Sequence, residues 1–439
     1  MPTKKSAERD ADLSGFSALG VRSEEPPISW LMNEALSHPQ IISLAAGFTD
    51  SPSLPVRETR EIMEEILGED RSARSALQYG NTIGDAGLRK STAERMLELD
   101  SRGCGELAEP DLYDPDRVLM THGSQQLLYM LTEMLFDPGD IVLVEDPTYF
   151  VYLGMAKSHG VRCRGIRMTP DGLDVDHLEE VLASLKKAGD LPRVKLLYLV
   201  SYFQNPSGVT TSLLRKAAAL KTLGRFEKDA GHPLYLLEDA AYRELKFAGD
   251  DVPSCLTLPG ASRRVIYTST YSKPFATGIR VGFGWLPDHL MRVVTRIKGN
   301  HDFGTAHVLQ QILAVAIRSG RFARHLKSLK DRYREKAAVM GGALREHCSE
   351  LLEWGEPEGG LYYWARLTDS ILSGRNSPLF KAALREEMLY VPGALCYADD
   401  PMRIKPDNEM RLSFGNATEL EIEKGIVRLA RAIRSVRGN

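Results

Sequence analysis

One lysine, Lys273, lies between two apolar segments that are typical of buried strands. Val265 to Tyr267 precede it and Val281 to Trp285 follow it, so its ammonium would lie near the core with little water. Desolvation or a nearby cation lowers the pKa of a lysine from about 10.4, and the neutral amine is a nucleophile that forms Schiff bases with aldehydes. Arg280 follows closely in the chain and could supply that cation. Lys273 is therefore either a reactive amine or a lysine held in a structural ion pair.

The residues around Lys273 also suit a phosphate group. Ser269, Thr270 and Ser272 carry hydroxyls, and Arg280 carries a guanidinium. An arginine combined with hydroxyl donors is well matched to phosphate oxygens. The same short segment therefore offers an amine and a phosphate site.

The chain that must position these residues alternates short apolar segments with helical patterns between about residues 115 and 285. Continuous apolar strands separated by helices are typical of a mainly parallel sheet covered on both faces. We therefore expect an α/β fold in which helices sandwich a mainly parallel seven-stranded sheet. The seven strands are expected at residues 118–120, 141–144, 161–166, 194–200, 234–237, 265–267 and 281–285, and intervening helices at 124–136, 175–187 and 211–228.

The rest of the chain divides into further parts. Residues 1–25 are polar and mixed in charge, so we expect a mobile arm. Residues 26–55 are expected to pack with a small domain, and residues 56–320 to form the large domain. A helical pattern from Arg321 to His347 predicts a linking helix. Strand-like and helical pieces after it predict a smaller α+β domain within residues 321–439.

Composition and charge exclude several classes of protein. The chain has 439 residues, 43% of them apolar and 26% charged, and its net charge of −3 gives no field that would attract nucleic acid or an anionic membrane. No apolar segment approaches the roughly 18 residues that cross a bilayer, and the charged N-terminus does not resemble a signal peptide. Its five cysteines are far apart and form no Cys-x-x-Cys pair. We expect a cytoplasmic protein with reduced thiols, no metal site, and no nucleic-acid or membrane partner.

Polar residues follow the carboxyl ends of the expected strands, which is where open parallel sheets bind ligands. Gly123 and Ser124 open a helix whose free N–H groups could bind a phosphate, although Ser124 could be a plain N-cap. Tyr149 could stack on a flat ring or lie in the core, and Asn205 lies in a tight Asn-Pro loop that could be a simple turn. Asp239 ends a buried strand and needs a cation, either an arginine or a protonated pyridine nitrogen.

These features are weak one by one but fit one cofactor when they are taken together. Pyridoxal 5′-phosphate needs an amine for its aldehyde, anchors for its phosphate, a platform for its ring and an acid for its ring nitrogen. The strand ends and the lysine segment offer all four.

Six motifs in their order along the chain resemble the class I/II aminotransferases, which are fold-type I pyridoxal-phosphate enzymes. The resemblance covers about residues 27 to 435, and two further segments, Ser43–Gly47 and Leu77–Tyr79, resemble the branch with 2-aminoadipate and kynurenine aminotransferases. The six motifs are Gly123–Gln126, Asp146–Tyr149, Asn205–Gly208, Glu238–Tyr242, Ser269–Lys273 with Arg280, and Met410–Phe414.

The resemblance implies a role for each cofactor-binding residue. Lys273 would form the internal aldimine with pyridoxal phosphate and move the proton between the substrate Cα and the cofactor C4′. Asp239 would pair with the pyridine nitrogen, and Tyr149 would stack on the ring. Asn205 and Tyr242 would hold the ring hydroxyl. The phosphate would be bound by residues that include Gly123, Ser124, Gln125, Thr270, Ser272 and Arg280.

The resemblance also implies a substrate site and a homodimer with shared active sites. Arg411 would take the substrate α-carboxylate in a bidentate pair, with Gly47 and Asn205 as further substrate-binding residues. Tyr79 would reach the cofactor phosphate of the neighbouring subunit. The substrate pocket departs from the family pattern, because Phe48 lies in a changed motif and Ser29 stands where the 2-aminoadipate branch often has an arginine.

Three functions follow from these expectations. The leading one is an aminotransferase that moves the amino group of an L-amino acid to a 2-oxo acid, with 2-oxoglutarate expected, by a ping-pong mechanism. The second keeps pyridoxal phosphate but carries out elimination, decarboxylation, cyclisation or oxidation, because pocket shape decides which bond at Cα breaks. The third is a ligand-sensing domain without catalysis, as in some transcription regulators. It would need a basic DNA-binding domain ahead of Pro26, where the chain has about 25 residues of balanced charge.

Overall fold

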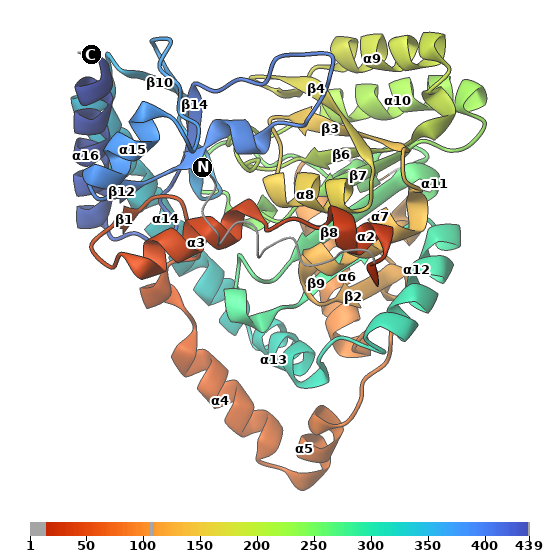
Figure 1. The fold of residues 1–439 in the computed structure, drawn as a ribbon. Helices are drawn as coiled ribbons and strands as arrows, with labels where there is room; N and C mark the ends of the chain where they lie inside the picture. The colour runs from red at the N-terminus through yellow and green to blue at the C-terminus, as the bar shows by residue number, and fades with distance from the viewer. Residues whose placement is uncertain (1–14, 105–106, 108, 438–439) are drawn as a thin grey trace.

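A large sheet forms the centre of the protein, which is described by a computed structural model for residues 15–104, 107 and 109–437 (Figure 1). The strand order is β2-β9-β8-β7-β6-β3-β4-β5. Strands β3, β4, β6, β7 and β8 pair in parallel, whereas β9 is antiparallel to both β8 and β2. The strands are β2 (Val118–Thr121), β3 (Ile141–Asp146), β4 (Arg162–Thr169), β5 (Gly172–Leu173), β6 (Val194–Val200), β7 (Tyr235–Asp239), β8 (Val265–Thr270) and β9 (Gly282–Trp285).

Seven of these strands match the predicted mainly parallel sheet, and β5 is an additional eighth strand. It contains two residues and pairs antiparallel with the end of β4. An apolar-segment pattern needs about four residues or more, so a two-residue strand after a turn leaves no such pattern in the sequence. The mixed α/β architecture is confirmed.

Helices connect the strands and pack against the sheet, as the sequence predicts (Figure 1). Asp174 caps the first turn of α9 by accepting a hydrogen bond from the His177 amide, and Gly189 ends this helix in the left-handed conformation with φ 76°. Ser212 and Gly231 delimit α10 in the same way. The helices of this part are α6 (Ala86–Ser101), α7 (Gly123–Leu135), α8 (Phe150–Ser158), α9 (Val175–Ala188), α10 (Leu213–Ala230), α11 (Ala261–Arg264), α12 (Asp288–His301) and α13 (His307–Arg318).

A second, smaller sheet lies beside long helices toward the C-terminus (Figure 1). Its order is β10-β11-β14-β13, and every pairing is antiparallel. Gly320, with φ 72°, precedes the helix α14 (Arg321–Cys348), and we propose that the large and small domains meet there. The other elements are β10 (Leu352–Trp354), β11 (Tyr362–Leu367), α15 (Pro378–Arg385), β12 (Met388–Leu389), β13 (Val391–Pro392), β14 (Glu409–Ser413) and α16 (Glu419–Arg437).

The N-terminal segment is held to both parts of the molecule. The expected mobile arm includes a helix, α2 (Ala18–Arg22), and Arg22 Nε donates a hydrogen bond to the Ser158 carbonyl at 3.0 Å. Residues 1–14 of that arm lie outside the described part. After α3 (Pro27–Ser37), strand β1 (Ile42–Ser43) pairs in parallel with β12, so residues 26–55 contact the smaller part. The helices α4 (Val56–Leu67) and α5 (Asp70–Leu77) then project from the body (Figure 1).

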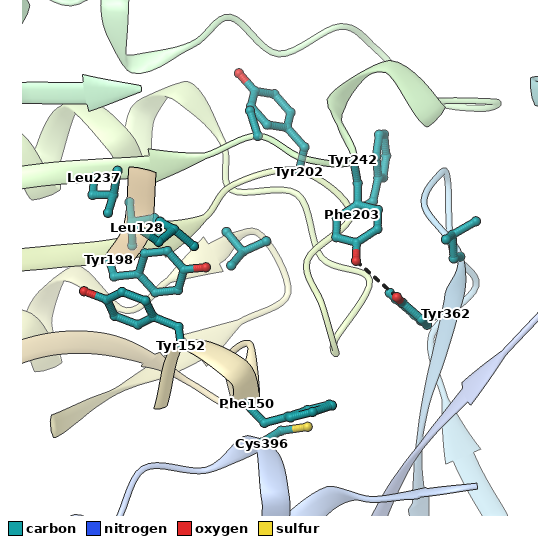
Figure 2. Close-up of a cluster of buried hydrophobic side chains, with 14 of the residues drawn as sticks. Leu128, Phe150, Tyr152, Tyr198, Tyr202, Phe203, Leu237, Tyr242, Tyr362 and Cys396 are labelled. Atoms are coloured by element: carbon teal, nitrogen blue, oxygen red, sulfur yellow. Dashed lines mark hydrogen bonds between the residues drawn. The ribbon is translucent and has the colours of Figure 1, made fainter. Parts of the chain in front are cut away.

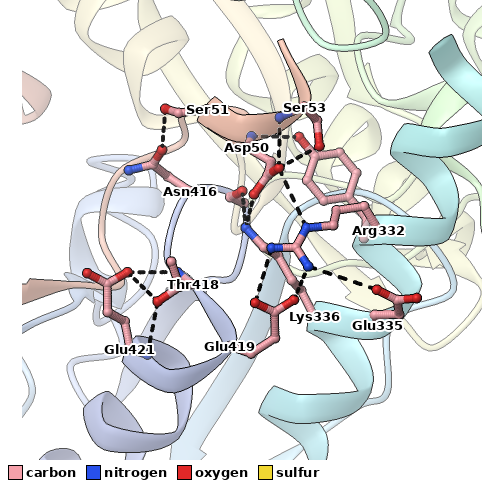
Figure 3. A network of polar contacts seen from close by, with 12 residues as sticks. Asp50, Ser51, Ser53, Arg332, Glu335, Lys336, Asn416, Thr418, Glu419 and Glu421 are labelled. Carbon is pink, nitrogen blue, oxygen red and sulfur yellow. Dashed lines mark hydrogen bonds and ion pairs between the residues drawn. The ribbon is translucent and has the colours of Figure 1, made fainter.

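A buried polar network fixes the end of this N-terminal segment (Figure 3). Asp50 is 1% exposed and accepts a hydrogen bond from the fully buried Lys336 of α14. Arg332 lies 3.6 Å from the same carboxylate and also pairs with Glu419 at the start of α16. Burial alone would raise the pKa of Asp50, but the hydrogen bonds from Lys336 and Ser53, together with the charges of Lys336 and Arg332, lower it. The network therefore ties residue 50 to two helices of the smaller part.

Within the described ranges, no helix is both long enough and apolar enough to cross a membrane.

Candidate active site

A cavity of about 270 Å³ lies where the large-sheet strands end and the smaller sheet begins. It brings together every predicted cofactor-binding and substrate-binding residue except Tyr79. These residues are Gly47, Gly123, Ser124, Gln125, Tyr149, Asn205, Asp239, Tyr242, Thr270, Ser272, Lys273, Arg280 and Arg411.

Lys273 follows the end of β8 and lines this cavity. Its Nζ donates a hydrogen bond to the Gly47 carbonyl at 2.7 Å. Burial lowers the pKa of Lys273; the nearby Tyr362 opposes this shift, and the Arg411 and Arg280 guanidiniums add to it. No acidic side chain in the described ranges pairs with it. The geometry therefore favours a reactive amine over a structural ion pair.

Asp239 is the last residue of β7 and is 4% exposed. Its carboxylate accepts hydrogen bonds from Tyr198 Oη at 2.9 Å and from the Ala241 amide at 3.1 Å. Burial raises the pKa of Asp239 to about 6, although these two hydrogen bonds oppose the shift. No cation among the placed residues pairs with Asp239. The carboxylate is therefore ready for a cationic ligand, such as a protonated ring nitrogen.

A candidate anion site lies at the first turn of α7. Gly123 begins this helix with φ 68°, and a Cβ at this position would come within 2.8 Å of Arg280 Nη2. Arg280 Nη1 donates to Ser272 Oγ at 3.1 Å and to the Thr277 carbonyl at 3.4 Å. Free helix N–H groups, a hydroxyl and a guanidinium without an acidic partner in the described chain form a suitable phosphate site.

Arg411 lies on β14 and is 2% exposed. Its Nη1 donates to Asn205 Oδ1 and its Nη2 to the Ala45 carbonyl, both at 2.7 Å. Its Nε is buried without a hydrogen-bond partner in the described part of the chain. A buried guanidinium that faces only neutral groups has capacity for a carboxylate ligand.

The cavity also contains residues that the sequence did not identify. Tyr362 on β11 hydrogen-bonds to Tyr242, and Phe150 follows Tyr149 at the start of α8. Tyr198 is a further missed residue, because it lies within β6 and its hydroxyl reaches Asp239 from a neighbouring strand. The alternation of side chains along β6 and the pairing of β6 with β7 could have identified Tyr198 once the strand order was known.

Two residues considered for the edges of the site, Ser29 and Tyr79, do not line the cavity of this chain. The cavity is lined by Ile28 and Met32 rather than by Ser29, because residues four apart share one face of α3. Tyr79 lies outside the cavity of its own chain, is 82% exposed, and has its ring 5.4 Å from the ring of Phe303.

Comparisons with known proteins agree with this geometry. A family model described as "Aminotransferase class I and II" matches residues 39–429. Aromatic-amino-acid aminotransferase 1 of Thermococcus litoralis is 32% identical over 417 residues, which cover 95% of this chain and 93% of the relative. The 2-aminoadipate transaminase of Thermus thermophilus is 31% identical over 404 residues, which cover 91% of each chain.

A solved structure shows the same fold. The crystal structure of kynurenine aminotransferase from Pyrococcus horikoshii, in complex with PMP, matches with a TM-score of 0.86 and 29% identity. The match covers 98% of this chain and 99% of that one. The extent of the family match and of the two sequence relatives shows that this chain belongs to the class I and II aminotransferases.

Proposed function

We propose that this aminotransferase binds pyridoxal 5′-phosphate and moves the amino group of an L-amino acid to a 2-oxo acid, with 2-oxoglutarate as the acceptor. The observation that supports this most strongly is the content of one cavity. It holds a half-buried amine, a buried carboxylate and two guanidiniums, and these charges are not neutralised by one another. Unpaired charges at this depth are costly unless a ligand compensates them.

The charged groups match the parts of the cofactor. Lys273 would hold the aldehyde carbon, Asp239 the protonated ring nitrogen, and the first turn of α7 with Arg280 the phosphate. Tyr149 would lie against the ring, and Asn205 and Tyr242 beside the ring hydroxyl. When bound, the cofactor delocalises the electron pair that is left at the substrate Cα. Lys273 Nζ would carry the proton to and from that carbon, because its lowered pKa favours the neutral base.

Arg411 would bind the α-carboxylate of both substrates. An amino acid and its 2-oxo acid share this group, so one guanidinium serves the donor and the acceptor in turn. Such alternation in one site is what a ping-pong mechanism requires. Asn205 would fix the guanidinium through the 2.7 Å hydrogen bond to Nη1, and the unpartnered Nε has a free donor.

The rest of the cavity favours a donor with an apolar or aromatic side chain. Its remaining lining includes Ile28, Met32, Phe48, Phe150 and Val151, none of which carries a charge. All of its charged side chains are already assigned to the cofactor or to the α-carboxylate. The relatives named for aromatic amino acids and for kynurenine agree with this preference.

A panel of amino donors tests the proposal. The purified holoenzyme would be given L-phenylalanine, L-tyrosine, L-kynurenine, L-2-aminoadipate and L-aspartate, each with 2-oxoglutarate, pyruvate or phenylpyruvate as acceptor. We expect glutamate to form from 2-oxoglutarate, fastest with the aromatic donors and without release of ammonia. Ammonia released in proportion to donor consumed would instead indicate elimination or oxidation and would reject the proposal.

We further propose a homodimer whose subunits share their active sites. Tyr79 and Phe303 are 82% and 55% exposed and contact each other edge to face outside the cavity, and Tyr79 comes two residues after the end of α5. A partner subunit would cover these apolar rings, and Tyr79 would then reach the partner's phosphate site.

Mixed dimers test whether Tyr79 acts across the interface. Lys273→Ala and Tyr79→Ala variants would be unfolded together, refolded and assayed. If Tyr79 serves the partner subunit, one site of each mixed dimer combines an intact lysine with an intact tyrosine and activity returns. If Tyr79 serves its own chain, no site is complete and the mixture stays inactive, which would reject the shared site.

A further inference from the structure

Tyr362 reaches the active cavity from the smaller sheet. It is the first residue of β11, is 2% exposed, and lies opposite Ser413 in the pairing of β11 with β14. Neighbouring positions of this pairing place Arg411 opposite Trp364. The residue is therefore supported by the same strand pair that carries the carboxylate-binding arginine.

The hydroxyl of Tyr362 contacts the residue expected beside the cofactor hydroxyl. Its Oη lies 3.1 Å from Tyr242 Oη, and Figure 2 marks this hydrogen bond between the two rings. The ring centroids are 5.7 Å apart at 76°, an edge-to-face arrangement. Tyr242 Oη also accepts a hydrogen bond from Asn205 Nδ2 at 3.4 Å. Either hydroxyl of the tyrosine pair can donate; with Tyr362 as the donor, the two neighbours occupy both lone pairs of Tyr242 Oη and leave its proton for the cofactor.

The ring of Tyr362 contacts the residue expected to bind the substrate carboxylate. Arg411 Cζ lies 4.3 Å from the ring centroid, which is within the range of a cation–π interaction. The hydroxyl of Tyr362 lies close to the backbone of Gly47, because a Cβ at this glycine would come within 2.7 Å of Tyr362 Oη. Gly47 in turn accepts the hydrogen bond from Lys273 Nζ. The ring therefore cannot move far without displacing one of these groups.

We propose that Tyr362 is a positioning residue with two separable functions: its ring fixes the Arg411 guanidinium for the substrate carboxylate, and its hydroxyl orients the Tyr242 hydroxyl toward the cofactor. The inference rests on the proposed function, because it assigns the carboxylate to Arg411 and the ring hydroxyl to Tyr242.

The two functions predict different effects for two substitutions. In Tyr362→Phe the ring stays over Arg411 but the hydrogen bond to Tyr242 is lost. Hydrogen bonds in a chain strengthen one another, so Tyr242 becomes a weaker donor to the ring oxygen of the cofactor. A weaker donor stabilises the deprotonated form of the bound cofactor less. In Tyr362→Leu the guanidinium loses its aromatic support as well.

The experiment compares holoenzyme variants by two readouts that do not depend on turnover. The first is the pH at which the visible absorbance of the bound cofactor changes. The second is the Kd of 3-phenylpropionate, a carboxylate without an amino group, measured from the same absorbance. Tyr363→Phe is the matched control, because Tyr363 is equally buried but its hydroxyl bonds to the Ala337 carbonyl and to Glu356.

We expect Tyr362→Phe to raise the spectral pKa by about half a unit to one unit while the Kd stays within about twofold. Tyr362→Leu should weaken 3-phenylpropionate binding by about fivefold or more. The inference is overturned if the spectral pKa of Tyr362→Phe equals that of Tyr363→Phe. It is also overturned if Tyr362→Leu binds 3-phenylpropionate with the wild-type Kd. A wild-type protein without cofactor absorbance would overturn the proposed function as well, so the two failures are distinguishable.

Discussion

Lys273 Nζ donates a hydrogen bond to the carbonyl oxygen of Gly47 at 2.7 Å, although the two residues are 226 positions apart in the chain. Lys273 follows the large sheet, whereas Gly47 follows β1, which pairs with β12 of the smaller part. The amine thus lies where the two parts meet. The site depends on both, so changes in either part should alter catalysis or cofactor binding.

Catalytic efficiency should fall even when Arg411 is replaced by lysine. Arg411→Lys keeps the charge but loses the planar pair of donors that matches a carboxylate. We expect kcat/KM for the amino donor to fall about 10- to 100-fold, since hydrogen bonds to charged groups are worth about 1.5 to 3 kcal/mol. Arg366→Lys on the adjacent strand β11 is the control, because Arg366 is 59% exposed and lies outside the cavity. Equal steady-state kinetics for both variants would contradict the assignment.

The hydrogen bond from Tyr198 should keep the pKa of Asp239 lower than burial alone would set it. The Tyr198 hydroxyl donates to Asp239 Oδ2 and thereby opposes the effect of burial, which raises the pKa of Asp239 to about 6. Tyr198→Phe should raise that pKa further, so less of the carboxylate is ionised near neutral pH. We expect the Kd of pyridoxal phosphate, measured by fluorescence titration, to increase about five- to tenfold. The ring of Tyr152 stacks on that of Tyr198 with centroids 4.0 Å apart (Figure 2), but within the described chain the Tyr152 hydroxyl does not bond to Asp239, so Tyr152→Phe should leave the Kd unchanged.

Glu145 should make the stability of the protein depend on pH. This buried carboxyl accepts hydrogen bonds from Gln204 Nε2 at 2.7 Å and from the Val200 amide at 2.8 Å, yet burial raises its pKa to about 8. Because the folded pKa lies above the unfolded value of 4.5, the folded protein binds more protons in this window. Its unfolding free energy should therefore fall as the pH rises from about 4.5 to about 8.

The variant Glu145→Gln cannot titrate and should lose this dependence. Its unfolding free energy relative to wild type should increase by about 1.4 kcal/mol for each pH unit in the window, as measured by urea unfolding. Glu179→Gln removes an exposed partner of Arg225, and its unfolding free energy should differ from that of wild type by a constant amount across the window. A constant difference between Glu145→Gln and wild type across the window would show that Glu145 does not titrate there.

The buried pair of Lys336 and Asp50 should stabilise the contact between the N-terminal segment and α14. Lys336→Met leaves the Asp50 carboxylate buried without its closest cation. We expect a loss of about 3 kcal/mol, at the low end for a broken buried pair because Arg332 stays 3.6 Å away. Lys405→Met breaks an exposed pair with Asp399 and should cost less than about 1 kcal/mol. Similar losses for both variants in chemical unfolding would contradict the role of the buried pair.

The sequence predicted the parts of the site that follow from local pattern. Each of Tyr149, Asn205 and Asp239 comes at or just after the end of an apolar strand, and parallel strands deliver such residues to one edge. Tyr362 and Tyr198 could not be identified in this way, because their contacts depend on register between strands that lie far apart in the chain. The same holds for Ile28 and Met32, whose face of α3 is selected by packing. Strand β5 was too short to produce a pattern.

The central claim, that Lys273 drives transfer of the amino group at this site, is tested most directly in a single half-reaction. Holoenzyme would be mixed with an aromatic amino acid in the absence of any 2-oxo acid, and the 2-oxo product and ammonia would be counted per active site. We predict about one 2-oxo acid and no ammonia for wild type, and a rate at least about a hundredfold lower for Lys273→Ala. A Lys273→Ala enzyme that releases the product at the wild-type rate would contradict the account.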